Sequence, residues 1–315
     1  MNVNTPLETI QLSKRYGRNT WALRDCTLAL PAGRVAALVG PNGAGKTTLL
    51  HLCAGLLEPT AGSVRVFGRS PLRQPRGTLP RVGLLAQDHP LYLSFTVADL
   101  LTFGRQLNPR WDDGLARSRI RKLGIPLDRP AGKLSGGQQA QVALVLALAK
   151  RPDLLLLDEP LASLDPLARR EFLRTLMDAV AESGMTVLLS SHIIGDLERV
   201  CDYLIILSGA RVQLAGDIAE LVRTHKRLVG PRANPAAVAS VHNVIEASHT
   251  ERQTTLLVRV NGHLFDPSWD VQEVSLEDIV LAYLSLGQQA DESIQAPPPT
   301  GGQQRQDQQR LEVVQ

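Results

Sequence analysis

The sequence predicts an α/β fold built around a parallel sheet. Three short apolar runs, residues 35–39, 154–157 and 186–189, have the length and composition of strands that are buried on both faces. Each run leads directly into glycine-rich or polar residues. Because the carboxyl ends of parallel strands meet at a shared edge of the sheet, we expect the functional residues to gather there.

The N-terminal segment predicts a second, smaller sheet. Residues 7–12 and 23–30 are rich in residues that favour strands, and they lead into the run at residues 35–39. This pattern indicates an antiparallel β subdomain. Tyr16 lies between the two strands, either as an exposed turn residue or as an aromatic ring available for stacking.

The stretch GPNGAGKTT, residues 40–48, predicts a phosphate-binding loop. Gly40, Gly43 and Gly45 permit backbone conformations that a Cβ would forbid, so successive N–H groups can surround a phosphate chain. The helix that begins near Lys46 adds the positive end of its dipole, and the Lys46 ammonium adds a full charge. The strand before the loop and the helix after it favour a nucleoside triphosphate site over a chance match in a flexible loop.

The next hundred residues predict two strands and two helices. Residues 63–67 and 81–85 have the composition of strands, and Gln87 stands at the end of the second. A lone glutamine at a strand end is usually only a polar terminus. The apolar spacing in residues 96–107 and 113–123 predicts two amphipathic helices, which we interpret as a helical subdomain inserted into the sheet.

The motif LSGGQ, residues 134–138, predicts the start of a further helix. Ser135 can serve as its N-cap, while Gly136 and Gly137 leave the backbone N–H groups uncovered. The motif is therefore either a second anion-binding helix end or only a cap and a hinge.

Carboxylates follow the apolar strand at residues 154–157. Burying Asp158 and Glu159 together without a partner is costly, and a bound cation offsets that cost. The Thr47 hydroxyl is placed to bind Mg²⁺ beside the phosphates. The alternative is that both acids cap the next helix. His192 ends the last apolar strand at the same edge, although a single histidine there is more often structural.

Bulk composition excludes several classes of protein. The 315 residues are 43% hydrophobic and 21% charged, as in ordinary soluble proteins, and the net charge of +3 argues against a large basic surface for nucleic acid. Three scattered cysteines predict reduced thiols in the cytosol and no metal site of their own. The N-terminus lacks a signal-peptide pattern, and no uncharged apolar run is long enough to span a bilayer, so a role at a membrane would require a partner.

Taken together, the motifs resemble the nucleotide-binding subunit of an ATP-binding cassette (ABC) transporter, a phosphate-loop (RecA-like) cassette. The matching elements occur in one order: residues 40–48, Gln87, residues 134–138, 154–160 and 162–165, and His192. The resemblance covers about residues 7–221, and LSGGQ combined with a phosphate loop is highly specific to the family. Within the family, residues 190–216 most resemble the ATPases of bacterial drug and antibiotic exporters.

The resemblance implies a role for each matching residue. ATP and Mg²⁺ would be held by the phosphate loop, namely Gly40, Pro41, Asn42, Gly43, Ala44, Gly45, Lys46, Thr47 and Thr48. Asp158 would reach the metal through water, and Gln87 would sense it. Glu159 would polarise the attacking water, His192 would contact the γ-phosphate, and Tyr16 would stack on the adenine.

The family also implies a two-chain site. The LSGGQ residues of one copy would face the γ-phosphate held by the other, through Ser135, Gly136, Gly137 and Gln138, and Asp165 would lie at that seam. The helix after LSGGQ departs from the family pattern, because Gln141 and Leu146 stand where arginines are usual.

We divide the chain into an ABC ATPase domain at residues 1–223, with its helical subdomain at about 88–150, and a C-terminal remainder. Residues 224–286 predict a small α+β accessory domain in which residues 254–260 form the clearest strand and 276–286 a closing helix. Residues 287–315 are rich in Gln and Pro and predict a disordered tail.

We therefore expect an ATP hydrolase that acts as a head-to-tail dimer, either with itself or with a paired cassette. It would drive export through separate polytopic permease subunits from the cytoplasmic face of the membrane. A soluble cassette ATPase acting on ribosomes or DNA is the alternative, although such proteins usually carry two cassettes or long insertions. A non-enzymatic binding module is disfavoured by the intact Lys46, Asp158, Glu159 and His192.

Overall fold

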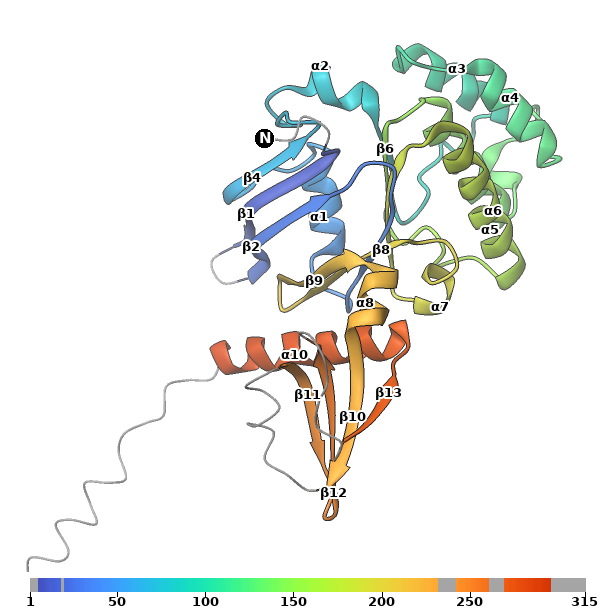
Figure 1. The fold of residues 1–315 in the computed structure, drawn as a ribbon. Coiled ribbons are helices and arrows are strands. Elements are labelled where there is room, and N and C mark those ends of the chain that lie inside the picture. Colours follow the sequence, from blue (N-terminus) through green and yellow to red (C-terminus); the bar gives the residue numbers. More distant parts are fainter. Residues whose placement is uncertain (1–4, 18–19, 232–241, 261–268, 296–315) are drawn as a thin grey trace, which may run out of the picture.

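A computed structural model describes residues 5–17, 20–231, 242–260 and 269–295, and it confirms the central parallel sheet (Figure 1). Six strands lie in the order β5-β6-β7-β3-β8-β9. The first five are parallel and β9 is antiparallel to β8. Their bounds are β3 (Val35–Val39), β5 (Val82–Leu85), β6 (Leu154–Leu157), β7 (Thr186–Ser191), β8 (Tyr203–Ser208) and β9 (Arg211–Asp217).

A three-stranded antiparallel sheet confirms the predicted N-terminal β subdomain. Its order is β2-β1-β4, formed by β1 (Leu7–Tyr16), β2 (Thr20–Leu30) and β4 (Ala61–Val66). The strand predicted at residues 63–67 therefore belongs to this sheet, where Leu7 pairs with Val66.

Two layers cover the central sheet. Helix α1 (Lys46–Cys53) and the antiparallel sheet pack on one face, while α5 (Gly136–Ala149), α6 (Pro166–Ser183) and α7 (Ile194–Leu197) pack on the other (Figure 1). Strand β3 shows why the apolar runs are continuous. Leu38 packs in the core on the α1 side of the sheet, and its neighbour Ala37 packs in the core on the side of α5, α6 and α7, so both faces of the strand are buried. Helix α7 is a single short turn that ends at Leu197.

The helical subdomain contains the two predicted amphipathic helices, α3 (Val97–Leu107) and α4 (Asp113–Lys122), packed against α5 through a separate apolar cluster. A capping box between Thr96 and Asp99 begins α3. The structure also has three short helical turns: α2 (Pro75–Thr78) and η1 (Leu79–Arg81), which precede β5, and η2 (Ala131–Lys133), which precedes α5. Within the described part of the chain, none of the helices combines the length and apolar character needed to cross a bilayer.

A four-stranded antiparallel sheet follows α8 (Ile218–Thr224), with the order β11-β12-β10-β13. Its strands are β10 (His225–Pro231), β11 (Asn243–His249), β12 (Gln253–Arg259) and β13 (Asp270–Glu273). Helix α10 (Leu276–Gln295) lies between this sheet and the cassette and contacts β8, β9 and β11 (Figure 1).

Helix α10 is longer than predicted. The sequence places its end at residue 286, before Gly287, yet the helix continues to Gln295, so residues 287–295 are helical rather than part of a tail. A Cβ at Gly287 would crowd Ser208, whose hydroxyl donates to the Leu284 carbonyl at 3.2 Å. Gly287 therefore permits close helix packing here instead of ending the helix. The rest of the predicted tail, residues 296–315, lies outside the described residues.

A buried histidine predicts how stability changes with pH. His225 is fully buried, its Nδ1 lies 2.8 Å from the Leu221 carbonyl oxygen and its Nε2 lies 3.1 Å from the Tyr283 hydroxyl. Burial lowers the pKa of His225 below 6.5, so this side chain binds a proton less readily in the folded chain than in the unfolded chain. The free energy of unfolding should fall as the pH drops below about 6.5, by at most about 1.4 kcal/mol per pH unit for this group.

Urea unfolding of the intact chain and of His225→Gln at several pH values measures this contribution. The variant should show a shallower loss of stability on acidification. Burial also lowers the pKa of His89, so adding His89→Gln should flatten the curve further. Identical slopes for the intact chain and both variants would contradict the assignment.

Candidate active site

A cavity of about 420 Å³ opens where the parallel strands end. Its lining comes from the loops that follow β3, β5, β6 and β7, from the first turn of α1 and from one residue of β2. The lining residues are Ala22, Asn42, Gly43, Ala44, Gly45, Lys46, Thr47, Thr48, Gln87, Glu159, Ala162 and His192. The fold thus brings four predicted elements to one cavity: the phosphate loop, Gln87, the turn that contains Glu159, and His192.

The glycines of the loop are required by close main-chain approaches. Gly45 is the N-cap of α1 with φ 102°, and a Cβ there would overlap the Ala22 carbonyl oxygen. A Cβ at Gly40 would overlap the Leu207 carbonyl oxygen of β8. These contacts fix the loop around the start of α1, where N–H groups have no side-chain cap.

The Lys46 ammonium is held at the centre of this loop. Its Nζ donates to the Gly40 carbonyl at 2.8 Å and to the Pro41 carbonyl at 3.3 Å. It also lies 3.2 Å from Glu159 Oε1, and both side chains are nearly buried, at 6% and 9% exposed. A charge so buried requires a partner, and Glu159 supplies it.

Glu159 connects Lys46 to His192. Its second carboxylate oxygen lies 2.7 Å from Nδ1 of His192, whose side chain is 53% exposed. The residue adopts φ 45°, a region that non-glycine residues rarely occupy and that often marks functional sites. The tight turn after β6 therefore directs the carboxylate into the cavity.

Ser190 supports this turn and was not found by sequence reasoning. The Ser190 hydroxyl accepts from the Glu159 backbone N–H at 2.7 Å and donates to Asp158 Oδ1 at 2.8 Å. It thus fixes both acids to the neighbouring strand β7. The available signal was a hydroxyl residue two positions before His192 at the end of an apolar strand.

Other predicted residues lie outside the cavity lining. Asp158 is buried at 1% exposed, just behind the lining, and Tyr16 is 45% exposed at the end of β1. The LSGGQ residues do not line the cavity of their own chain. Ser135 is exposed and caps α5 as predicted. Its hydroxyl accepts a hydrogen bond from the Gln138 backbone N–H at 3.2 Å, and its own backbone N–H donates to the Gln138 side-chain oxygen at 3.1 Å.

The donor groups fit a magnesium nucleotide. Thr47 offers a hydroxyl, Gln87 an amide oxygen and Asp158 a carboxylate, which are the oxygen ligands that Mg²⁺ prefers. Among the described residues there is no group of three or more His, Cys, Asp or Glu side chains arranged to hold a metal by themselves. A cation at this site would therefore share its coordination with phosphate oxygens and water.

The ABC transporter family matches residues 23–162. The chain is 35% identical over 266 residues to the aliphatic sulfonates import ATP-binding protein of Shigella flexneri serotype 5b, covering 83% of this chain and 98% of that protein. It is 37% identical over 222 residues to the sulfate/thiosulfate import ATP-binding protein of Chromobacterium violaceum, covering 68% of this chain and 59% of that protein. The molybdenum import ATP-binding protein of Mycobacterium tuberculosis is also 37% identical, over 66% of this chain and 60% of that protein.

The chain spans about 60% of the length of the last two relatives. Solved structures agree with the fold. A structure of the ATP-binding subunit of an ABC transporter superimposes with a TM-score of 0.62 at 29% identity, covering 70% of this chain and 92% of that one. The cbiO1 subunit of Clostridium perfringens gives a TM-score of 0.59 at 28% identity, over 69% of this chain and 90% of that one.

The fold and the cavity define a phosphate-loop nucleotide-binding protein. Together with the relatives, they show that this chain belongs to the ABC transporter family, among its ATP-binding subunits. The sequence-based prediction of the family and of its fold is thereby confirmed. The narrower resemblance to drug and antibiotic exporters is not confirmed, because the three relatives described above are named as import proteins.

Two neighbouring glycines offer a matched test of the loop. Gly43 and Gly45 both have positive φ, at 81° and 102°, but only at Gly45 would a Cβ collide with main chain. Gly43→Ala should cost about 1 kcal/mol of backbone strain. Gly45→Ala should also displace the loop, so its affinity for ATP should be at least about tenfold lower than that of Gly43→Ala. Calorimetric titration with ATP measures the difference, and equal affinities would contradict the geometry.

Proposed function

We propose that this chain hydrolyses ATP to drive a membrane permease. The observation that carries the proposal is the continuous contact Lys46–Glu159–His192 inside the phosphate-loop cavity. Lys46 would neutralise the phosphates, Glu159 would polarise the attacking water and His192 would contact the γ-phosphate. Such a site acts mainly by positioning and electrostatics, which suits phosphoryl transfer.

The buried ion pair indicates how ATP would activate the site. Lys46 Nζ and Glu159 Oε1 lie 3.2 Å apart, so the two charges balance each other. A triphosphate in the loop offers Lys46 a more negative partner, so Glu159 Oε1 becomes free to accept a hydrogen bond from water. Its other oxygen remains beside His192. The water oxygen would then attack the γ-phosphorus as the bond to the β–γ bridging oxygen breaks. The proton of the water would pass to Glu159 and from there to the released phosphate, while Lys46 and the loop N–H groups stabilise the charge on the departing diphosphate.

The remaining ligand contacts follow from the same cavity. Thr47, Gln87 and Asp158 would hold Mg²⁺, which supplies positive charge to the phosphate oxygens. Tyr16 would stack on the adenine, and Lys14 lies 5.5 Å from the centroid of its ring.

We propose that a second copy, or a paired cassette, completes the site. Ser135 and Gly136 are exposed and lie outside the cavity of their own chain. The N-terminus of α5 therefore has its N–H groups and dipole available to a γ-phosphate bound by a neighbour. ATP would then form part of the contact between the two chains.

A groove beside the cavity offers a place for the permease. This groove, of about 460 Å³, lies between the end of α1, β5 and α5 and is mostly apolar; its lining includes Leu56, Leu79, Leu84, Leu85, Leu91 and Leu146. Exposed Tyr92, Phe95 and Phe103 form a cluster nearby, with ring centroids 5.1 to 6.3 Å apart. We propose that an apolar segment of a polytopic permease docks here, at the cytoplasmic face of the membrane.

One segment connects the groove with the nucleotide. Gln87 lines the cavity, while Ala86, Pro90 and Leu91 line the groove. A change in the contacts of Gln87 can therefore move the surface on which the permease would rest. Leu146, where the family usually has arginine, makes that surface more apolar.

We propose export as the direction of transport, on the resemblance of residues 190–216 to the ATPases of drug exporters. The relatives named as sulfonate, sulfate and molybdenum import proteins favour import instead. Inverted membrane vesicles that carry the permease and this chain distinguish the two, because only an exporter accumulates its substrate inside them on addition of ATP.

We also propose the division into a cassette at 1–223 and an accessory domain at 224–286, since α8 ends at Thr224 and β10 begins the four-stranded sheet.

Replacing Glu159 by Gln should preserve ATP binding and slow hydrolysis by a factor of about 100 or more, because the amide cannot act as a base toward water. Glu171→Gln, on the exposed side of α6, is the matched control and should leave turnover unchanged. Phosphate release measures the rate. Normal turnover in Glu159→Gln would remove this residue from the proposed role.

Docking of the permease is tested at the aromatic cluster. Tyr92→Ser combined with Phe103→Ser should reduce co-purification with the membrane permease by about tenfold, since buried aromatics dominate such interfaces. Leu281→Ser, which removes an apolar side chain on α10 that is 54% exposed, against 58% for Tyr92, should leave co-purification unchanged. ATP binding should be the same in all three proteins. Undiminished co-purification of the double variant would contradict the proposed groove.

A further inference from the structure

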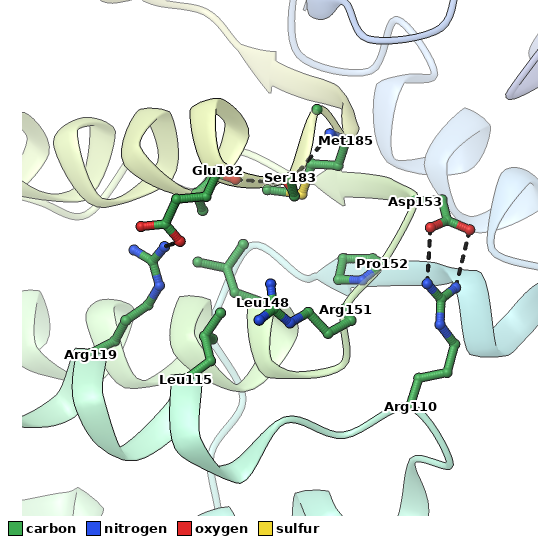
Figure 2. Close-up of a pocket in the computed structure, with 12 residues that line it drawn as sticks. Arg110, Leu115, Arg119, Leu148, Arg151, Pro152, Asp153, Glu182, Ser183 and Met185 are labelled. Carbon is green, nitrogen blue, oxygen red and sulfur yellow. Dashed lines mark hydrogen bonds and ion pairs between the residues drawn. The ribbon is translucent and has the colours of Figure 1, made fainter.

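Two arginine-rich cavities lie outside the nucleotide site, and they differ in how their charges are paired. The first, of about 320 Å³, lies between α4, α5 and α6 (Figure 2). Each guanidinium there has a carboxylate: Arg110 contacts Asp153 twice, at 3.0 and 3.1 Å, and Arg119 contacts Glu182 at 2.7 Å. Arg151 in turn contacts Asp112 at 2.6 Å. These pairs join the helical subdomain to the rest of the cassette.

The second cavity, of about 390 Å³, lies between α6 and α7, and three of the four arginines in its lining have no ion pair with another described residue. Arg170, Arg174 and Arg199 line it with exposed side chains, and none of the three has an ion pair or hydrogen bond to another described residue. The carboxylate in this lining, Asp196, lies 3.8 Å from a fourth arginine, Arg169. We name this cavity the arginine pocket.

The arrangement of the arginine pocket suits a doubly charged oxyanion. Arg170 and Arg174 lie one turn apart on α6, and Arg199 reaches the same cavity from the turn after α7. Three unpaired cations repel one another, and a bound anion relieves that repulsion. Guanidinium groups bind phosphate oxygens in a bidentate manner, and Leu173 and Met177 supply an apolar floor for an organic group.

We propose that the arginine pocket binds a phosphate monoester, as a second anion site separate from the phosphate loop. The two helices that line the pocket follow the turns that contain Glu159 and His192. Pro166 begins α6 after the turn of Glu159, and Asp196 belongs to α7, which follows His192. A ligand there ties α6 to α7 and so restrains the Glu159–His192 contact. This regulatory consequence rests on the proposed function, whereas binding itself does not.

Binding is tested on the full chain in a Lys46→Ala background, which removes the central cation of the phosphate loop. Inorganic phosphate in calorimetry probes a soluble ligand, and flotation with phosphatidylcholine vesicles containing phosphatidic acid probes a lipid headgroup. Arg170→Ala, Arg174→Ala and Arg199→Ala together should weaken binding of the accepted probe by at least about tenfold. The matched control changes three exposed arginines on other elements, Arg73→Ala, Arg76→Ala and Arg121→Ala, and should keep the affinity.

The outcomes separate the possibilities. Selective loss with phosphate supports a soluble ligand, and selective loss with vesicles supports a headgroup. No binding of either probe, or equal loss in the control, overturns the pocket. Replacing the same three arginines by lysine provides a variant with unchanged charge and should bind more weakly than the Lys46→Ala parent, because bidentate contacts are lost.

Hydrogen exchange tests the restraint separately from catalysis. In the Lys46→Ala chain, the accepted probe should slow exchange at residues 194–200, and the triple alanine variant should show no such protection. Unchanged exchange despite binding would overturn the restraint between α6 and α7. Failure of ATP hydrolysis alone would leave both results in place and would count only against the proposed function.

Discussion

One buried ion pair, Lys46 with Glu159, lies in the phosphate-loop cavity, and the proposed chemistry depends on it. Lys46 is held by two main-chain carbonyls in a loop that closes only because Gly40 and Gly45 lack a Cβ, and its charge is balanced by Glu159. A buried charge must keep a partner. We therefore propose that binding of the triphosphate and release of the Glu159 carboxylate are one exchange, in which Lys46 passes from Glu159 to phosphate. In this proposal Glu159 acts as a base only when phosphate takes its place beside Lys46.

The strands that build this pair also connect it to distant surfaces. The segment after β5 carries Gln87 into the cavity and then forms part of the apolar groove. The turns after β6 and β7 carry Glu159 and His192, and the helices that follow form the arginine pocket. A permease in the groove, an anion in the pocket and ATP in the loop would thus act on neighbouring loops of one sheet edge. This shared edge gives the proposed coupling a physical route.

Local features were predictable from the sequence, and features that depend on packing were not. Apolar runs such as residues 35–39 predicted the buried strands, and Ser135 predicted the start of α5, because burial and capping are written in neighbouring residues. The support given by Ser190 depends on the register between β6 and β7, which no local pattern encodes. The sequence predicted that the last helix ends at residue 286, yet α10 continues past Gly287, which packs against Ser208. The position of the LSGGQ residues outside their own cavity acquires a meaning only with a second chain.

The central claim is that each catalytic site is shared between two chains, Lys46 coming from one and Ser135 from the other. Mixing two inactive variants, Lys46→Ala and Ser135→Asp, tests it most directly. Random pairing makes about half of the dimers mixed, and each mixed dimer contains one intact site formed by Lys46 of one chain and Ser135 of the other. The account predicts that ATP turnover reappears on mixing, although neither variant alone hydrolyses ATP. A mixture as inactive as its components would contradict the shared site.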